Sequence, residues 1–583
     1  MNLLQNAPFF PKRKKTQKSF LTFYFFWSTI KQLIVFPVRI SFKNTMEETI
    51  SMSMSSDSTD TPKGNLHGFK THAKKDILSG FLVFLIALPL CLGISLASGY
   101  PAVAGIFTAI VGGLVATFLS NSELTIKGPA AGLIVIALGC VQDFGFTGGV
   151  DPEKDFQAYR LALGVGVVAG VYQIILGFFR VGILVKLFPH AAIHGLLASI
   201  GIIIIAKQFP VLLGLSSHGS PLDLLASIPY FIINMNPKIA FIGILSVIIV
   251  LSYSYIKNPT LKLIPAPMLM LLIIVPMETF WGIGREGAYT FNNQVFEVGQ
   301  KFLVNVPANL LKAVTFPDFS GVITETGIKY TVLFAIIGSL EGILSAKAID
   351  GIDPWERKTN LDRDLIGTGI ANTLSAFIGG LPMISEIVRS KANIDNGAQT
   401  RFANFYHGMF LLIFVALIPG VINQIPLAAL AALLVITGYR LASPNEFKSI
   451  YREGKDQFIV FVSTIFGVLA TDLLKGLAIG IGVRIVIHFI RGGSIFRLNA
   501  KIIPERDQSV TIFLRGSIIF SSWIPLRKQL QRFLDNGKRV TLDITETQLV
   551  DRRVMSKIDE WKIKFKEKGL ELTVRALMTS VDE

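Results

Sequence analysis

The strongest constraint on this chain is a long apolar body that continues into a short, charged tail. Residues 77–490 hold 49 charged side chains in 414 positions, whereas residues 491–583 hold 30 in 93 positions. Soluble domains carry roughly 25 % charged residues, and the mean hydropathy of the whole chain is +0.55. A wholly soluble enzyme, a disordered chain and a fibre are therefore excluded. We expect a polytopic α-helical membrane protein with a water-exposed tail.

Fourteen apolar segments follow one another along the body. A helix needs about 20 apolar residues to cross the hydrocarbon core of a bilayer, and several of these segments are shorter. An even number of segments places both ends of the body on the same side of the membrane. The predicted segments are residues 77–98, 101–120, 129–141, 159–180, 182–207, 237–256, 263–282, 330–349, 364–379, 384–395, 402–420, 424–441, 457–473 and 475–490.

Charges on the connections between segments predict the orientation. Lys and Arg concentrate on the fourth, sixth, eighth and twelfth connections, whereas the third connection is acidic. Because basic residues stay on the cytoplasmic side, we expect both termini in the cytoplasm and the body in the cell inner (plasma) membrane. Many of the Lys and Arg residues behind the net charge of +16 flank apolar segments, as membrane topology predicts. No basic stripe with interleaved aromatic residues indicates nucleic acid as a partner.

The N-terminal region, residues 1–76, is expected to be a partly disordered cytoplasmic extension. Residues 1–45 combine a basic run with an aromatic-rich stretch, which fits an amphipathic segment on a membrane surface. Met46 opens a polar stretch and is an alternative start, in which case residues 1–45 are not part of the working protein. Both interpretations stay open at this stage.

Two apolar segments repeat one pattern 237 residues apart. PHAAIHGLLASIG (189–201) and PLAALAALLVITG (426–438) share Pro, two Ala, two Leu and the final Gly at identical spacing. They are the fifth and twelfth segments, so the repeat spans seven segments and its second copy is inverted in the membrane. Inverted repeats are typical of secondary transporters. The alternative is a chance similarity between two helices rich in Ala and Leu.

The third and tenth segments are too short to cross the bilayer unaided. Both sequences, 127–140 and 379–394, carry Pro shortly after Gly, and Pro suits the first turn of a helix. A half-helix that begins inside the membrane leaves backbone N–H groups unpaired, and these attract anions. Two ordinary proline kinks are the alternative. The predicted anion site is the backbone around Ala130, Ala131, Met383, Ile384 and Ser385.

Ionisable residues inside the membrane are costly and usually functional. Glu341 and Ser345 share one helix face, so we expect them to bind a proton or a sodium ion; a structural hydrogen bond of Glu341 is the alternative. Arg389 is expected to lend charge to a bound anion, or else to pair with a carboxylate such as Glu386. His194 is interpreted as a packed histidine outside the site. The sequence predicts no cofactor and no metal site apart from this sodium site.

The body resembles the sulfate permease (SulP) family of inorganic anion transporters. The resemblance rests on four stretches that occur in the expected order within residues 77–490. They are LIALPLCLGISLASGYPAVAGIFTAIVGG (85–113), KGPAAG (127–132), GSLEGILSA (338–346) and GGLPMISEIVRSKANIDNGAQTRFANFYHG (379–408).

This resemblance implies a seven-plus-seven inverted repeat in which a core domain moves against a gate domain. It implies an anion held between the third and tenth segments, and a homodimer. Glu341 occupies the place of an acidic residue that the family uses for cation coupling. Arg389 occupies the place of a frequent tenth-segment arginine.

Four positions depart from the family pattern. Leu90 follows Pro89 where many members carry Gln, which removes one polar contact to the substrate. Glu341 and Ser345 stand where sodium-coupled bicarbonate transporters carry Asp and Thr, which leaves the coupling ion open. Glu386 stands where small polar residues are common, and its charge opposes an anion.

The tail, residues 491–583, is predicted to form a small α/β domain. Residues 510–520 and 539–545 have strand patterns, each followed by a helical stretch, and a third strand comes last. This order resembles the STAS domain that follows the last span in the family. Asp551 is followed by Arg552, where phosphorylation-regulated relatives carry Ser or Thr. A folding and docking module is therefore expected in place of a phosphorylation switch.

The sequence as a whole favours a secondary active transporter of a small inorganic anion, with sulfate or bicarbonate first among the substrates. Cation symport and anion exchange both fit an alternating-access cycle. A nucleobase–cation symporter of the same fold and a passive anion channel are the alternatives. An enzyme is not expected, because no nucleophile–base pair is apparent. The expected partners are the anion, the lipid bilayer and a second copy of the chain.

Overall fold

The computed structural model describes most of the body and most of the tail. The described residues are 61–180, 189–216, 219–256, 264–417, 419–490, 499–504, 509–518, 520–550 and 552–575. Both interpretations of residues 1–45 therefore lie outside the described residues.

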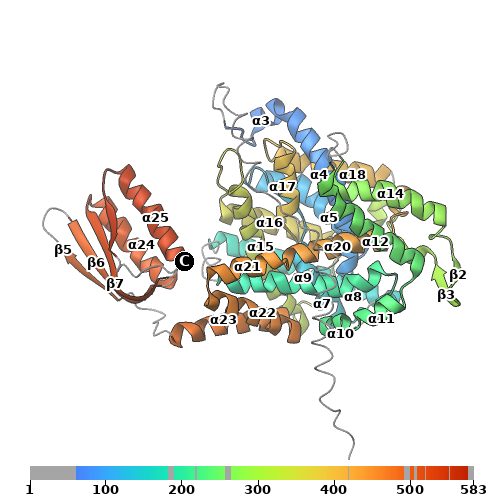
Figure 1. Ribbon diagram of the computed structural model, residues 1–583. Helices are drawn as coiled ribbons and strands as arrows, with labels where there is room; N and C mark the ends of the chain where they lie inside the picture. Colours follow the sequence, from blue (N-terminus) through green and yellow to red (C-terminus); the bar gives the residue numbers. More distant parts are fainter. Residues whose placement is uncertain are drawn as a thin grey trace, which may run out of the picture.

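Each of the fourteen predicted segments corresponds to one helical segment of the structure (Figure 1). Two of these segments contain a change of helix type: the second combines α5, η1 and α6, and the third combines η2 and α7. In chain order, the segments are α4 (Ala73–Ala97), α5 (Ala102–Val111) with η1 (Gly112–Ala116) and α6 (Thr117–Leu119), η2 (Ala131–Leu133) with α7 (Ile134–Asp143), α8 (Pro152–Phe178), α9 (His190–Leu212), α12 (Pro237–Ser252), α14 (Ala266–Trp281), α15 (Glu325–Asp350), α16 (Leu361–Phe377), α17 (Ile387–Asp395), α18 (Phe402–Leu417), α20 (Leu427–Leu441), α22 (Lys455–Ala470) and α23 (Leu473–Ile490).

Short elements connect these helices. The strands β2 and β3 form an antiparallel hairpin, and Asn292 and Asn293 at its turn both have positive φ, as a tight two-residue turn requires. The short elements are α3 (Leu66–Thr71), α10 (Pro221–Ala226), α11 (Ile228–Ile233), η4 (Tyr253–Tyr255), β2 (Gly287–Phe291), β3 (Gln294–Val298), η5 (Gln300–Phe302), η6 (Leu310–Ala313), α19 (Pro419–Ile422) and α21 (Pro444–Glu453).

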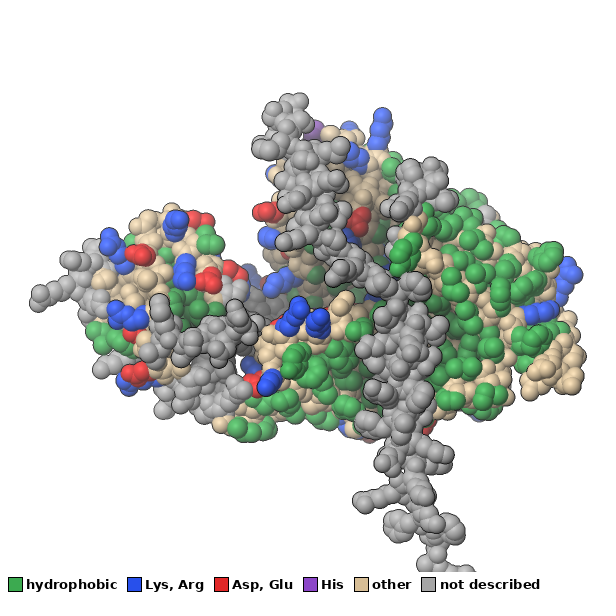
Figure 2. All heavy atoms as spheres, viewed as in Figure 1, with side chains coloured by type: hydrophobic (Ala, Val, Ile, Leu, Met, Phe, Trp, Pro, Cys, Tyr) green, Lys and Arg blue, Asp and Glu red, His purple; other side chains and the backbone are tan. Residues whose placement is uncertain are grey.

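The outer surface of the body is apolar. Six of the described helices are long and apolar enough to cross a membrane, and four shorter apolar helices accompany them. Figure 2 shows hydrophobic side chains spread over the face around α12 and α14, where Phe241, Ile248 and Phe280 are exposed. An apolar surface of this extent marks contact with a membrane. The chain is therefore a multi-pass membrane protein.

The two copies of the repeated pattern meet at their shared glycines. A Cβ atom on Gly201 of α9 would lie 2.5 Å from the carbonyl oxygen of Gly438 on α20, and the reverse distance is 2.6 Å. Equivalent residues of the two copies thus contact each other, as expected for repeats related by a two-fold axis. Only glycine lets the two backbones approach this closely.

The helices pack in two groups. One group contains α4, α5, α7, α8 and α15 to α18, and the other contains α9, α12, α14, α20, α22 and α23. The first group comprises segments one to four and eight to eleven, and the second comprises the remaining six. The family resemblance implies a core domain and a gate domain, and we call the first set of helices the core group and the second the gate group.

The tail forms a small α/β unit of its own. Its strands are β5 (Asn499–Pro504), β6 (Ser509–Ile518), β7 (Arg539–Val550) and β8 (Leu572–Arg575), and its helices are α24 (Phe520–Asp535) and α25 (Arg552–Glu567). The sheet has the order β5-β6-β7-β8 (Figure 1), with β5 antiparallel to β6 and the other pairs parallel. The predicted β-α-β-α-β order is present, and β5 precedes it. The sequence NAKIIP of β5 carries too little alternation to predict this edge strand.

Candidate functional site

Two short strands meet at the centre of the core group, at a point that we call the crossing. β1 (Ile126–Pro129) pairs antiparallel with β4 (Met383–Glu386), and each strand leads into a short helix. The expectation that a proline opens each helix is therefore wrong: Pro129 ends β1, and Pro382 precedes β4. Irregular backbone at membrane depth needs hydrogen bonds from the protein, and this pairing supplies them. Because the strands are antiparallel, the two helices leave the crossing in opposite directions.

Polar side chains from neighbouring helices hold β4 and the residues just before it in place. Asn372 of α16 accepts a hydrogen bond of 2.6 Å from the Met383 N–H and donates one of 3.1 Å to its carbonyl oxygen. The Thr108 hydroxyl accepts a hydrogen bond of 2.7 Å from the Leu381 N–H. All four residues are buried. The position of β4 is therefore set by α5, which lies far away in sequence, and by α16, which precedes β4 directly.

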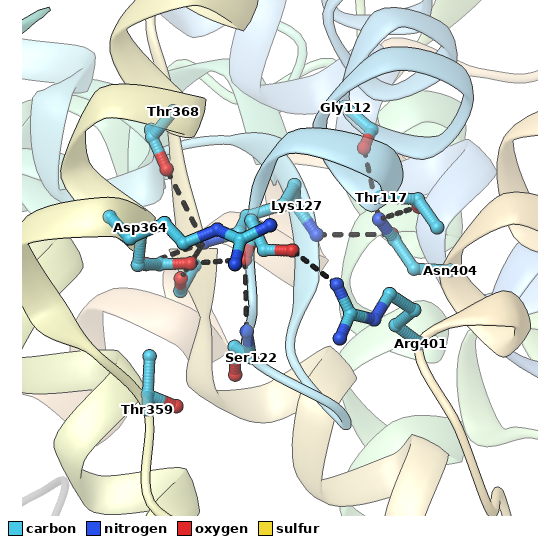
Figure 3. A network of polar contacts seen from close by, with 12 residues as sticks. Gly112, Thr117, Ser122, Lys127, Thr359, Asp364, Thr368, Arg401 and Asn404 are labelled. Carbon is cyan, nitrogen blue, oxygen red and sulfur yellow. Dashed lines mark hydrogen bonds and ion pairs between the residues drawn. The ribbon is translucent and has the colours of Figure 1, made fainter. Parts of the chain in front are cut away.

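A buried ion pair ties the crossing to α16 (Figure 3). The Lys127 Nζ donates to both Asp364 carboxylate oxygens, at 2.7 and 2.8 Å, to the Thr368 hydroxyl at 3.3 Å and to the Ser385 hydroxyl at 2.6 Å. Ser120 donates a further hydrogen bond to Asp364. The Lys127 side chain is 1 % exposed. Removing one partner of such a pair typically costs about 3–5 kcal/mol, because a buried charge is left uncompensated.

The structure brings the five backbone residues of the predicted anion site together at this crossing. Ala130 and Ala131 directly follow β1, whereas Met383, Ile384 and Ser385 lie within β4. Some of their polar groups already have partners, namely the backbone groups of Met383, the hydroxyl of Ser385 and the N–H of Ala130, which donates to the Pro382 carbonyl oxygen. The first amides of η2 thus remain as the candidate anion ligands of the third segment.

Glu341 reaches the start of η2 from α15. Its carboxylate interacts with the backbone N–H of Gly132, and a Cβ atom on Gly132 would overlap that carboxylate. The enclosed Oε2 atom of Glu341 has no hydrogen-bond partner among the described residues. Ser345 is buried one turn further along α15. The predicted coupling residue therefore contacts the predicted anion site directly.

Glu386 lies beside the neighbouring amide. Its carboxylate interacts with the backbone N–H of Ala131, and its enclosed Oε1 atom lacks a hydrogen-bond partner in the described part of the chain. Among the described residues, no ion pair joins Glu386 to Arg389, although the two charges are near enough to interact. The interpretation of Glu386 as a salt-bridge partner of Arg389 is thus not supported.

Arg389 is a fully buried cation. Its side chain lies against β1, where a Cβ atom on Gly128 would overlap the guanidinium. The residue is 1 % exposed, and none of its guanidinium nitrogens has a hydrogen-bond partner among the described residues. The Cys91 thiol and the buried His407 ring lie near it. A buried charge without a partner is very costly, so the guanidinium needs a partner that is not part of the described chain.

Sequence reasoning missed several of these groups. Lys127 and Asp364 had a visible signal, because each is a charged residue in or beside an apolar segment. His407 had none beyond its residue type, and both its ring nitrogens lack partners among the described residues. His194, interpreted as a packed histidine, contacts the Glu446 carboxylate. Within the described ranges, no group of three or more His, Cys, Asp or Glu side chains is arranged to hold a metal.

Curated relatives of the chain carry transporter names. The putative sulfate transporter YbaR of Bacillus subtilis (strain 168) is 24 % identical over 507 residues, which cover 86 % of this chain and 94 % of that protein. The bicarbonate transporter BicA of a Picosynechococcus species is 24 % identical over 438 residues, which cover 75 % of this chain and 74 % of that protein.

Solved structures share the fold. The transmembrane domain of a cyanobacterial bicarbonate transporter, BicA, superposes with a TM-score of 0.57 at 22 % identity, covering 70 % of this chain and 97 % of that one. The murine anion transporter Slc26a9 in its inward-facing state gives a TM-score of 0.62 at 14 % identity, covering 94 % of this chain and 92 % of that one. The predicted membrane transporter fold is therefore confirmed.

One protein-family model matches most of the chain. The model described as the sulfate permease family matches residues 73–464, which include the first twelve helical segments and the first ten residues of α22 but none of α23. The match contains both crossing strands and every residue predicted for the anion and coupling sites. The expected resemblance is thereby confirmed, and the chain belongs to the sulfate permease family.

Proposed function

We propose that this protein is a secondary active transporter of a small inorganic anion, with sulfate and bicarbonate as the first candidates. The names of its relatives support both substrates, since they include sulfate transporters and bicarbonate transporters. The anion binds where β1 and β4 cross, beside the starts of η2 and α17. An alternating-access cycle then carries the occupied core group past the gate group.

The observation that carries this proposal is the buried guanidinium of Arg389. It lies beside the crossing, almost without exposure, and has no hydrogen-bond partner among the described residues. A bound anion would supply the missing partner through charge-assisted hydrogen bonds. The half-helix starts add the positive ends of two helix dipoles. A site of this kind favours a small, compact anion over a large organic molecule.

The coupling ion is a proton or sodium. Glu341 provides a carboxylate at the anion site, and Ser345 lies one turn further along the same helix. The carboxylate changes the net charge of the site when it takes up a cation, which links anion binding to the cation gradient. The Lys127–Asp364 pair supports this cycle by holding β1, β4 and α16 as one rigid unit.

The proposal extends to the cellular setting. Lys and Arg on alternate connections support a cytoplasmic position for both termini and a location in the cell inner membrane. The tail then lies in the cytoplasm as a STAS-like docking module. Two copies of the chain form a homodimer, as the family resemblance implies.

Uptake of labelled anions into proteoliposomes tests this function. The full chain is reconstituted, and uptake of labelled sulfate and bicarbonate is measured with and without inward proton or sodium gradients. We expect saturable uptake of at least one anion, driven by one of the gradients. Arg389→Ala should lower this uptake strongly, because the bound anion loses its charged donor.

A matched control lies two residues along the same helix. Lys391 is exposed and pairs with Asp395 on the surface, so Lys391→Ala removes the same charge away from the crossing and should leave uptake unchanged. Ion currents far above transporter turnover would instead identify a passive channel. Inhibition by uracil or adenine with no anion uptake would identify a nucleobase symporter.

A further inference from the structure

Two carboxylates from different parts of the chain lie beside the first amides of η2. Glu386 is the residue that precedes α17, yet its side chain makes no capping hydrogen bond to that helix. Its carboxylate instead reaches the Ala131 N–H. Glu341, from α15, covers the next amide at Gly132. Two consecutive N–H groups, the candidate ligands of an incoming anion, thus each have a carboxylate of the protein beside them.

Each carboxylate also keeps one enclosed oxygen without a partner. These atoms are Oε2 of Glu341 and Oε1 of Glu386, and neither has a hydrogen-bond partner among the described residues. A buried acceptor without a donor is unfavourable. A proton on a carboxylate oxygen removes part of this cost, because it neutralises the charge and turns that oxygen into a donor.

The surrounding charges are too few to hold both carboxylates and an anion together. From α17, Arg389 contributes one uncompensated positive charge. The start of η2 adds only a partial positive charge, and Cys91 of α4 and His407 of α18 lie beside Arg389. Lys127 of β1 is neutralised by Asp364 of α16. An anion that joins two ionised carboxylates therefore meets a site with net negative charge.

We infer that Glu386 is a second proton-carrying residue, and that it competes with the transported anion for the Ala131 amide until a proton neutralises it. A proton from the water phase binds the Glu386 carboxylate, the amide is released, and the anion accepts its hydrogen bond. The anion and the proton then cross together. This inference rests on the proposed function and specifies proton symport as its coupling.

The test measures anion binding to the purified full chain by calorimetry between pH 5 and pH 8. Sulfate and nitrate are the probes, because their charges stay constant over this range. For the unaltered protein, the Kd should fall on acidification by up to about tenfold per pH unit for each proton taken up. Glu386→Gln should bind more tightly than the unaltered protein at pH 7.5, and its pH dependence should be shallower by one proton.

Glu325→Gln is the matched control, because it removes the same charge from the exposed first turn of α15 and should leave the Kd unchanged. Weaker binding by Glu386→Gln, or an unchanged pH dependence, would overturn the inference. Tighter binding with sodium, at a Kd independent of pH, would also overturn it. Failure of the unaltered chain to bind any anion would instead refute the proposed function itself.

A second measurement keeps the inference testable if Glu386→Gln does not fold. Calorimetry of sulfate and nitrate binding to the unaltered chain, in buffers of different ionisation enthalpy, counts the protons taken up with each anion. Uptake of about one proton or more near neutral pH supports the inference. No proton uptake overturns it.

Discussion

Lys127 of β1 and Asp364 of α16 form an ion pair of 2.7 Å that is almost fully enclosed in the body. The two residues lie 237 positions apart in sequence, and their pairing joins the third segment of the chain to the ninth. The pair also fixes Ser385 of β4, because the same ammonium group donates to its hydroxyl. The geometry of the proposed anion site thus depends on a contact outside the site itself.

The first prediction concerns this pair. Lys127→Met leaves Asp364 buried without a partner and should lower the free energy of unfolding by about 3–5 kcal/mol. Thermal and denaturant unfolding of the purified protein in detergent would measure the loss. The double variant Lys127→Met with Asp364→Leu should recover most of the stability, since an apolar pair often replaces a buried ion pair without cost. A single variant as stable as the unaltered chain would contradict this account.

The second prediction concerns coupling at Glu341. Glu341→Gln keeps the shape of the side chain but fixes it in a neutral state, so anion transport should no longer respond to the driving gradient while the protein still folds. Uptake into proteoliposomes with and without proton and sodium gradients gives the measurement. Gradient-driven uptake at the original rate in this variant would refute a coupling role for Glu341.

The third prediction concerns Arg389. Arg389→Ala should weaken anion binding by about 1–3 kcal/mol, because it removes a charged hydrogen-bond donor. Calorimetry on the purified variant measures this change, with Lys391→Ala as the control on the same helix. If both variants bind the anion as tightly as the unaltered chain, and Arg389→Ala only reduces protein yield, Arg389 has a structural role instead.

The fourth prediction concerns the contact between α9 and α20, where the two repeats meet. Gly201→Ala places a methyl group against the carbonyl oxygen of Gly438, which forces α9 and α20 apart and should cost about 1–3 kcal/mol of stability. Gly482→Ala is the control, because a Cβ atom at Gly482 meets no atom within 4 Å. Equal melting temperatures for the two variants would show that α9 and α20 do not pack at this glycine contact.

The fifth prediction concerns the tail. The predicted anion site lies wholly before residue 491, so removal of residues 500–583 should leave the anion affinity of detergent-purified protein nearly unchanged. Transport can still fall, because loss of a docking module would harm assembly or restrict the motion of the gate group. Calorimetry on the truncated protein decides between these effects. If the truncated protein folds but binds no anion, the prediction that the site lies before residue 491 is wrong.

Several parts of the site were predictable because their signal is local. The apolar lengths of the fourteen segments locate the helices, and the paired short segments locate the crossing of the two half-helices. Glu341 and Arg389 stood out because charged residues inside a membrane are rare. The start of each half-helix was predicted wrongly, since a strand precedes both α17 and η2.

The sequence by itself determined the membrane class, the order of the helices and the repeat, because segment length, hydropathy and spacing are properties of consecutive residues. Only the tertiary structure decided which polar groups at the crossing have partners. Lys127 is neutralised by Asp364, whereas Arg389, four residues after Ser385, lacks a partner among the described residues. The physical reason is that pairing depends on distance in space, and the partners come from helices hundreds of residues apart. The local sequence pattern identifies the charged residues that are costly to bury. The tertiary structure decides which of them find a partner in the protein and which are left to an anion.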